Sequence, residues 1–423
     1  MKMIIEEINQ SNGSYYRKSI LDENHQVIYK KDVNFYIKTA VNHNFEFIVL
    51  YDNQMKIVEP AYKYLNILIR YKSVNTRNLY ANIIKKFYSF AELQGKELID
   101  LDFDDFVKFQ YFLLGYNSGI ISEYLYTYSG VSAKVTGKYL NVCKDFLKKS
   151  HFQNYKLVET IANQNSFKNI NLNHDCPKFI SFAQMKQFID YITDDSSLSY
   201  VEKLEYKAIY SLMEYGGLRI GEVLGLTIQD FSQDSKPELP NHKIVTIRNR
   251  TTDSRNQSAK TCMNVFDRKD YKSSEYCMKN VGYQTVLIPN ETFDLVMDYY
   301  DSISYKFQRK GITCLKADDI YMEENNYYIF HNKDKNTILN LKILRDYTRK
   351  MFEHFDIPTD KMKRNNNLLH RFRHGYIMHL LYEKHYNPTT VIKYSRHSST
   401  RSLEPYNNPT DEQLATILNS INE

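Results

Sequence analysis

Two kinds of hydrophobic pattern divide the first third of the chain. Near the N-terminus, apolar residues form short runs rich in β-branched and aromatic side chains, HQVIYKK and FEFIVLY, which are typical of strands. From Glu59 onward, apolar residues recur every three or four positions instead, as on one face of a helix. The pattern therefore predicts a β-containing N-terminal region over 1–55 and a helical region over 56–162.

Two segments of the helical region carry this pattern clearly. SVNTRNLYANIIKKFYSFAEL begins with Ser73 and Thr76, both candidate helix caps. VSAKVTGKYLNVCKDFLKKS places Val142, Phe146 and Leu147 on one face and distributes five lysines over the others: Lys134, Lys138, Lys144, Lys148 and Lys149. These lysines form either a solvated face or a contact surface for a polyanion.

A polar, Asn-rich segment, NQNSFKNINLNHDCP, ends this region and predicts a linker over 163–177. A second region, 178–409, begins with two amphipathic segments. ISFAQMKQFIDYI has Ser181 as its candidate cap, and VEKLEYKAIYSLMEY stops at Gly216 and Gly217, as a helix does at its C-cap. We therefore expect two helices at the start of the second region.

The second region also contains two segments with strand character. HKIVTIRNR and YQTVLIP predict two strands, joined by an unusually long polar connection over 251–283. Connections of this length in a compact domain are usually functional or mobile. Helical patterns resume at Phe293 and continue to a C-terminal helix or tail over 410–423. The expected fold class is therefore mainly α with a small antiparallel sheet.

Composition narrows the class of protein. The chain is 42% hydrophobic and 25% charged, as in ordinary soluble proteins, and it has no run of 18 apolar residues that would span a membrane. In the N-terminal MKMIIEEINQ, acidic residues stand where a signal peptide would continue its apolar run, so we expect no export signal. Five scattered cysteines form neither a disulfide framework nor a zinc spacing, which fits the cytoplasm. A net charge of +6 gives mild support for a polyanionic partner.

The segment YGGLRIGEVLGL contains the first candidate for chemistry. Ile220, Val223 and Leu224 have helical spacing and are expected in the core, and Arg219 stands directly before them, after the glycine break. A guanidinium held rigidly at a helix start can grip two phosphate oxygens at once, with Glu222 as its support. The alternative is an ordinary surface arginine.

The segment LLHRFRHGYIMHLL contains two histidines four positions apart, which is also the spacing of a metal-binding pair. The positive charges of Arg371 and Arg373 would repel a cation there, so we expect no metal. His370 and Arg373 are three positions apart and so share a helix face, where together they would meet an anionic ligand. His374 is expected to pack or to hydrogen-bond internally.

The segment RHSSTRSLEPY places Tyr406 nine positions after His397. A tyrosine alone is uninformative, because the chain has 37 of them, and one that follows Pro405 is most simply an exposed residue. A phenol, with a pKa of about 10, attacks at neutral pH only where cations stabilise its phenolate. The arginines and histidines of the three segments would supply such cations.

Together, GGLRIGEVLGL, HRFRH and RHSSTRSLEPY resemble, in order and spacing, the conserved boxes of the tyrosine recombinase (phage integrase) family. The resemblance covers about 177–410. The continuation YNNPTDEQLATI is more similar to transposon-encoded members than to cellular dimer-resolution enzymes. The resemblance implies an α+β catalytic domain over 178–409 and, less specifically, a helical SAM-like core-binding domain over 56–162, the two forming a C-shaped DNA clamp.

The resemblance also implies a role for each motif residue. Arg219 and Arg373 correspond to the two arginines that clamp the scissile phosphate. His370 corresponds to a histidine that handles a proton or donates a hydrogen bond, and His397 to the His/Trp position that contacts the phosphate. Tyr406 corresponds to the nucleophile.

One role and one position depart from a simple match. The family uses a lysine on the hairpin between two strands as general acid for the leaving 5′-oxygen. Lys260 in NQSAKT matches the local pattern best, whereas Lys279 lies nearer the second strand. Arg396 stands where the family often has glycine, and it either touches DNA or is simply exposed.

The resemblance implies a site-specific recombinase, the integrase or transposase of a mobile element, that cleaves and rejoins DNA through a 3′-phosphotyrosine intermediate. It implies no metal and no other cofactor. The expected partners are double-stranded DNA at specific recombination sites and other transposon-encoded proteins, in a bacterial cytoplasm, with no membrane. The alternatives are a type IB topoisomerase-like relaxing enzyme and a non-catalytic DNA-binding accessory protein.

Assembly and the N-terminal region stay open at this level. In the 410–423 tail, Thr410 and Gln413 form a capping-box pair before an apolar stripe of Leu414, Ile417, Leu418 and Ile421. This helix docks either on its own domain or on a neighbouring protomer of a homotetramer assembled on DNA. Residues 1–55 either bind a second DNA site, as an arm-binding domain does, or brace the helical domain.

Overall fold

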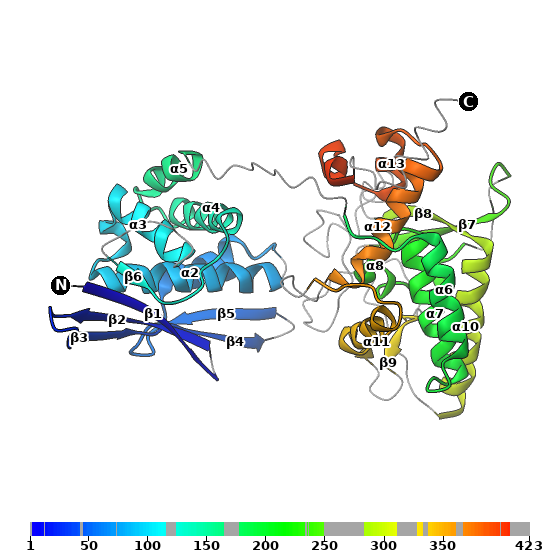
Figure 1. The fold of residues 1–423 in the computed structure, drawn as a ribbon, viewed down its shortest axis with the longest axis horizontal. Helices are drawn as coiled ribbons and strands as arrows, with labels where there is room; N and C mark the ends of the chain where they lie inside the picture. Colours follow the sequence, from blue (N-terminus) through cyan, green and yellow to red (C-terminus); the bar gives the residue numbers. More distant parts are fainter. Residues whose placement is uncertain are drawn as a thin grey trace. The chain divides into compact units, whose positions relative to one another are not determined.

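The computed structural model describes most of the chain, which divides into two compact units, Met1–Leu172 and Asn173–Glu423 (Figure 1). The described residues are 2–11, 13–42, 45–72, 74–115, 124–164, 177–232, 235, 237–248, 283–310, 328–332, 337–360, 367–397 and 399–406. Each unit is described by itself below.

The first unit begins with a sheet in the order β3-β2-β1-β6 and a separate hairpin, β4–β5. The strands β1 and β2 form an antiparallel hairpin in which Gly13 has a φ of +124°, a conformation that favours glycine. The short β6, far along the chain, adds to β1 in parallel. The strand bounds are β1 Lys2–Gln10, β2 Gly13–Leu21, β3 Val27–Val33, β4 Tyr36–Asn42, β5 Phe45–Tyr51 and β6 Tyr124–Tyr126.

The strands predicted at HQVIYKK and FEFIVLY are confirmed as β3 and β5. The strands β1, β2 and β4 carry no signal that the sequence patterns singled out. In β1 only Ile5 is fully buried, and charged or partly exposed side chains surround it, so the alternation of apolar and polar residues is weak.

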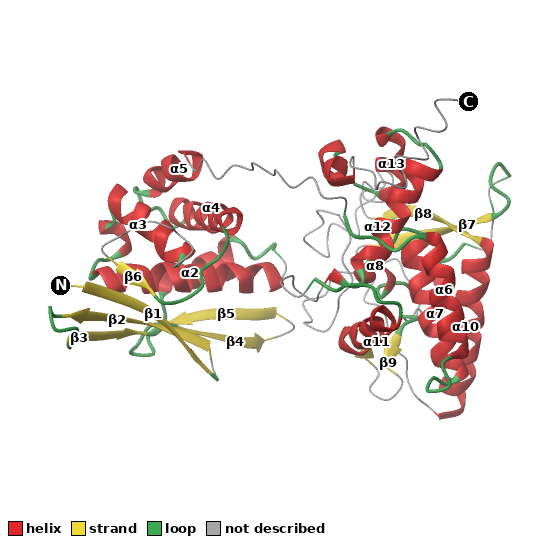
Figure 2. Ribbon diagram, viewed as in Figure 1, coloured by secondary structure: helices red, strands yellow, loops and turns green. Residues whose placement is uncertain are grey.

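Helices cover one face of these strands, as Figure 2 shows for the first unit. Asp102 begins α3 with a reciprocal capping box to Asp105, and Gly115, with a φ of +60°, ends it. A side chain at Gly115 would collide with the backbone of Tyr128. The bounds are α1 Glu59–Lys63, a π-helical turn η1 Tyr64–Leu68, α2 Val74–Gln94, η2 Leu98–Asp100, α3 Phe103–Leu114, α4 Ala133–Lys149 and α5 Tyr155–Gln164.

The strands and helices of the first unit share one hydrophobic core. Ile5, Tyr16 and Leu50 from the strands pack with Phe87 and Phe109 from the helices in a single buried cluster. The end of α2 is held by the sheet, because two strand lysines donate to the backbone carbonyls of Glu92 and Leu93. Cations placed there also oppose the negative end of the helix dipole. The first 55 residues are therefore folded against the helices that follow them.

The second unit begins with the two expected helices. Both start with reciprocal capping boxes, in which Ser181 pairs with Gln184 and Ser199 pairs with Glu202. The predicted strands are also confirmed, as β7 and β8, which pair in antiparallel orientation. The bounds are α6 Phe182–Asp194, α7 Tyr200–Glu214, α8 Ile220–Val223, η4 Ile228–Asp230, β7 His242–Arg248, β8 Tyr283–Pro289, α10 Asn290–Lys310, β9 His331–Asn332, β10 Thr337–Ile338, α11 Leu341–His354, α12 His370–Met378, η7 His379–Glu383, α13 Pro388–Ser395 and η8 Thr400–Tyr406.

Helix α7 is the central element of the second unit. It is buried along most of its length and contacts α6, α8, α10 and α12. A smaller apolar cluster joins α12, η7, α13 and η8, and its members are Tyr376, Ile377, Met378, Leu380, Val391, Leu403 and Tyr406. The main hydrophobic core of this unit, to which α7 belongs, therefore fixes α8 and α12. The smaller cluster fixes η8, the last described segment, against α12.

The described chain is mostly helical with small antiparallel sheets, as the sequence predicts. None of the described helices combines the length and the apolar character needed to cross a bilayer. The 251–283 connection lies outside the described residues up to position 282, which includes Lys260 and Lys279, and so do the 410–423 tail and most of the 163–177 linker.

Candidate active site

Arg219 is the N-cap of the short helix α8 and follows a turn that only glycine permits. Gly217 has a φ of +60°, and a Cβ there would lie 2.3 Å from the ring of Tyr376. Glu222 accepts hydrogen bonds from the backbone N and from Nη1 of Arg219, both at 2.8 Å. The supporting role predicted for Glu222 is confirmed, because a fully buried carboxylate holds a guanidinium that is 29% exposed.

Arg373 lies one turn into α12 and is almost completely buried. Its two terminal nitrogens donate to the backbone carbonyls of Gly217 and Ser395. Burial lowers the pKa of Arg373, and the positive charges of Arg396 and Arg219 lower it further. A guanidinium stays charged at neutral pH all the same, so α12 carries a buried cation between the α8 turn and the end of α13.

The two histidines of α12 lie against each other, with ring centroids 4.4 Å apart. Nδ1 of His374 is 3.0 Å from the carbonyl oxygen of Lys178, and its ring meets that of Tyr406 edge-on at 5.4 Å. The prediction that His374 packs and hydrogen-bonds internally is confirmed. Within the part of the chain that the structure describes, no three His, Cys, Asp or Glu side chains are grouped to hold a metal ion.

Two imidazoles of the site have lowered pKa values. Desolvation by the atoms packed around the ring lowers the pKa of His370, although the residue as a whole reaches solvent, and the charges of His374, Arg373 and Arg219 lower it further. Burial, followed by the charges of Arg373 and Arg219, lowers the pKa of His397 to about 4. Both rings are therefore neutral at pH 7 and can donate or accept a hydrogen bond. This corrects the expectation that these histidines supply cations, which leaves the positive charge of the site to the arginines.

His397 is also oriented by a neighbour. Its Nδ1 lies 2.7 Å from the hydroxyl of Ser395, a fully buried residue at the end of α13. The carbonyl of the same Ser395 accepts a hydrogen bond from Arg373. One residue thus ties the histidine to the buried arginine.

Tyr406 ends the 3₁₀ segment η8 and is buried, with only 5% of its surface exposed. Its carbonyl oxygen accepts a hydrogen bond of 2.5 Å from the hydroxyl of Tyr382, and its ring packs in the small apolar cluster. A negative charge on its phenol would interact with Arg373. The alternative that Tyr406 is merely an exposed tyrosine after Pro405 is wrong.

Arg396 corrects the sequence analysis, since it is neither exposed nor on a surface that could touch DNA. It is 7% exposed, and its Nη2 donates to Glu222 Oε2 at 2.5 Å and to the Gly217 carbonyl at 3.3 Å. Its backbone caps α13 with a φ of +56°, in the left-handed region. That conformation costs a non-glycine residue about 1–2 kcal/mol. It also accounts for glycine at this position in the family that the motifs resemble.

The structure brings five of the six predicted site residues together, with Tyr406 against α12 and His397 beside the α8 turn. The sixth, Lys260, lies outside the described residues. Sequence reasoning missed the part that Arg396 plays, and also the carbonyls of Gly217 and Ser395. Three guanidiniums around one carboxylate, with two neutral imidazoles and a phenol, can hold a phosphodiester and stabilise charge that develops on it.

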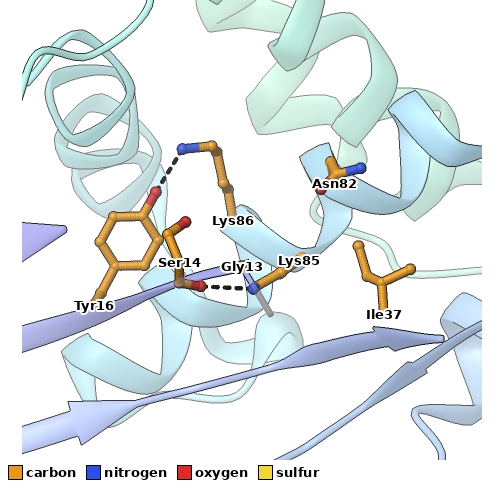
Figure 3. Close-up of a pocket in the computed structure, with 7 residues that line it drawn as sticks. All are labelled: Gly13, Ser14, Tyr16, Ile37, Asn82, Lys85 and Lys86. Carbon is orange, nitrogen blue, oxygen red and sulfur yellow. Dashed lines mark hydrogen bonds between the residues drawn. The ribbon is translucent and has the colours of Figure 1, made fainter. Parts of the chain in front are cut away.

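A cavity of about 330 Å³ in the first unit differs from the candidate active site in how its cations are paired (Figure 3). Two lysines of α2 point into it, yet both have partners within the fold. Lys85 donates to the carbonyl of Ser14 at 2.7 Å, and Lys86 donates to the hydroxyl of Tyr16 at 2.6 Å and to Glu7 at 3.2 Å. These contacts join the sheet to the helix.

Known proteins were compared with the chain by sequence and by structure. No family model and no curated protein matches the sequence. Among solved structures, the XerH site-specific recombinase bound to its palindromic difH substrate, in a post-cleavage complex, matches with a TM-score of 0.55 at 14% identity, over 83% of this chain and 81% of that one. A variant of the Tn1549 transposon integrase in complex with circular intermediate DNA has a TM-score of 0.48 at 13% identity, over 85% and 98%. The XerA recombinase has a TM-score of 0.36 at 16% identity, over 86% and 99%.

The match with XerH spans both units and four fifths of each chain. At 14% identity such a match identifies a fold, and it agrees with the motifs that place arginine, histidine and tyrosine around α8, α12 and η8. The chain therefore has the fold of the tyrosine recombinases.

Proposed function

We propose that the protein is a site-specific DNA recombinase that cleaves and rejoins DNA through Tyr406. The phenolic oxygen attacks the scissile phosphorus, the bond from phosphorus to the 5′-oxygen breaks, and a 3′-phosphotyrosine remains. The phenol gives its proton to the neutral ring of His370, the histidine whose family counterpart handles a proton, and the departing 5′-oxygen gains one from a general acid. The observation that carries this proposal is the burial of Tyr406 beside the cationic site formed by Arg219, Arg373 and Arg396.

The arginines differ in what each can do. The guanidinium of Arg219 is partly exposed while its other side is fixed on Glu222, which supports direct contact with the phosphate. Arg373 donates to two carbonyls from a buried position, so it acts mainly through its charge. The neutral rings of His370 and His397 would supply hydrogen bonds without demanding a proton first.

The nucleophile acts within its own chain in this proposal. Tyr406 is held by the hydroxyl of Tyr382 and by the cluster on α12 and α13, all in one protomer. Each chain then carries a complete set of described site residues, to which the general acid is added from the 251–283 connection.

Double-stranded DNA at specific recombination sites is the proposed substrate, because the XerH structure with the same fold holds difH DNA. The two units would clamp the duplex as a homotetramer assembles on it, in a bacterial cytoplasm and with other transposon-encoded proteins as partners.

The tail over 410–423 would dock on a neighbouring protomer. Deleting it should impair exchange between two sites at least tenfold more than binding to one, as measured by plasmid recombination and gel shift. Equal losses in both assays would refute that role.

The proposal is tested with a nicked suicide substrate, which traps the covalent intermediate. The wild-type chain should form a protein–DNA adduct, and Tyr406→Phe should form none while it binds DNA nearly as well. Tyr394→Phe is a matched control, since Tyr394 is an exposed tyrosine on α13 and should keep the adduct. An undiminished adduct in Tyr406→Phe would sink the assignment of the nucleophile.

Two other outcomes identify the alternatives. Adduct formation followed only by rejoining of the original strand, with no exchange between two sites on a plasmid, would identify a relaxing enzyme of the type IB topoisomerase kind. DNA binding without any adduct would identify a non-catalytic accessory protein.

A further inference from the structure

Arg396 combines two unusual features, a left-handed backbone in a non-glycine residue and a charged side chain that is buried. It holds a left-handed conformation at the C-cap of α13, and its side chain is 3% exposed. A residue kept in a sparsely populated conformation inside a site is evidence that its side chain is needed there.

The contacts of Arg396 all lead to groups that position other site residues. Its Nη2 meets Glu222 Oε2, the same oxygen that accepts from the backbone N of Arg219. It also reaches the Gly217 carbonyl, to which Arg373 donates. Through one nitrogen, Arg396 therefore contacts groups that hold both Arg219 and Arg373.

The rest of its guanidinium is not satisfied by the protein. Nε and Nη1 of Arg396 are buried and have no hydrogen-bond partner among the described residues. A buried cation with unused donors is costly unless opposite charge is near. Glu222 supplies one negative charge, yet it also serves Arg219 and faces Arg373, so positive charge remains in excess.

This excess has a chemical counterpart. Three arginines and one glutamate leave two formal positive charges, and without Arg396 only one would remain. A phosphodiester carries one negative charge, and the pentacoordinate phosphorane formed by attack of a phenolate carries two. With Arg396 present, the two positive charges of the site therefore match the two negative charges of the phosphorane better than the single charge of the phosphodiester.

We propose that Arg396 is a positioning residue that donates a hydrogen bond to Oε2 of Glu222. Its charge keeps the site positive in excess, which stabilises the phosphorane. This proposal rests on the proposed function. It assigns to Arg396 no contact with DNA, because its nitrogen atoms are buried. It acts through Glu222 and through its field on Arg219 and Arg373.

The test compares cleavage of two suicide substrates by Arg396→Met, measured as the single-turnover rate of adduct formation. One substrate has the natural phosphodiester, and the other has a methylphosphonate at the scissile position, whose phosphorane carries one negative charge less. We expect Arg396→Met to react about 10- to 100-fold more slowly than wild type on the phosphodiester. On the methylphosphonate the loss should shrink to about threefold or less, because less charge needs to be stabilised.

Three further variants keep the test decisive. Arg396→Lys retains the charge and should recover part of the rate, while Arg396→Gly releases the backbone strain and should react as slowly as Arg396→Met on the phosphodiester. If Arg396→Met does not fold, these two variants decide. Arg349→Met removes a partly exposed arginine from α11 and should leave both rates unchanged.

The possible results separate the two proposals. If wild type forms no adduct on either substrate, the proposed function fails. If wild type reacts and the Arg396 variants lose the same factor on both substrates, Arg396 is only structural and this inference is overturned. Variants that react as fast as wild type would overturn it as well.

Discussion

Two groups of cations, one in each unit, are neutralised to opposite degrees. In the first unit, Lys86 meets Glu7 and the Tyr16 hydroxyl, and Lys96 meets Asp102 and Asp105. In the second unit, three arginines converge on one buried carboxylate and two backbone carbonyls. Balanced charge holds a fold together, whereas an uncompensated cluster costs stability and marks a place built for an anion.

The largest effect is expected for the lysine that would act as general acid beside the arginines of the second unit. Lys260→Ala or Lys279→Ala, whichever residue is the general acid, should slow cleavage of a natural site by about 10²–10⁴-fold, because the 5′-oxygen then leaves without a proton. A substrate with sulfur at the 5′-bridging position needs no proton on leaving.

The sulfur substrate should restore the rate for the true general acid only, as measured by adduct formation. The other lysine variant serves as the control, since it should cleave both substrates like wild type. Rescue of neither variant would mean that the proton comes from another group.

A second test removes the only described negative charge that the arginines of the site share. Glu222→Gln leaves two buried guanidiniums without a counter-charge and should lower the free energy of unfolding of the second unit by about 3 kcal/mol. Urea unfolding at pH 7, followed by a probe in that unit, measures the loss. Glu353→Gln, an exposed change on α11, should have no effect.

The acid dependence of stability gives an independent readout of Glu222. Burial alone would raise the pKa of this carboxyl, but the charges of Arg396, Arg373 and Arg219 outweigh it and lower the pKa. The stabilisation is therefore complete above the unfolded pKa of about 4.3 and is lost as the pH falls through the lower folded value. Glu222→Gln should remove this part of the acid dependence. An unchanged acid profile would contradict the pairing.

The smallest effect is expected for a balanced cation of the first unit. Lys86→Met loses the contacts with Glu7 and Tyr16 and should lower the stability of that unit by about 1 kcal/mol. The rate of adduct formation at saturating DNA should stay within about twofold of wild type. Lys134→Met, an exposed change on α4, is the stability control. A large loss of rate in Lys86→Met would break the contrast between the units.

Much of the second unit can be predicted from sequence because its signals are local. Ser181 begins a helix with its capping box, and Arg219 precedes a helical stripe of which Val223 and Leu224 are buried and Ile220 is partly buried. The five motif residues could be placed in one site by their resemblance to a family pattern. Their catalytic roles remain predictions.

The remaining features depend on contacts between distant residues. Strand β6 joins β1 from more than a hundred positions away, and Arg396 meets Glu222 across 174 positions. A sequence pattern does not give the φ of Arg396 or its burial, so an arginine in a polar segment reads as exposed. Strand β1 likewise carries only a weak alternation, since Ile5 alone of its residues is fully buried.

The left-handed arginine before His397 also bears on how relatives of this chain are recognised. A search pattern that demands glycine at that position passes over any chain with this arrangement. Where glycine does occur there, the second oxygen of Glu222 needs another donor or loses one. Positions 222 and 396 should therefore change together across relatives, and an arginine at 396 should be found only beside an acidic residue at 222.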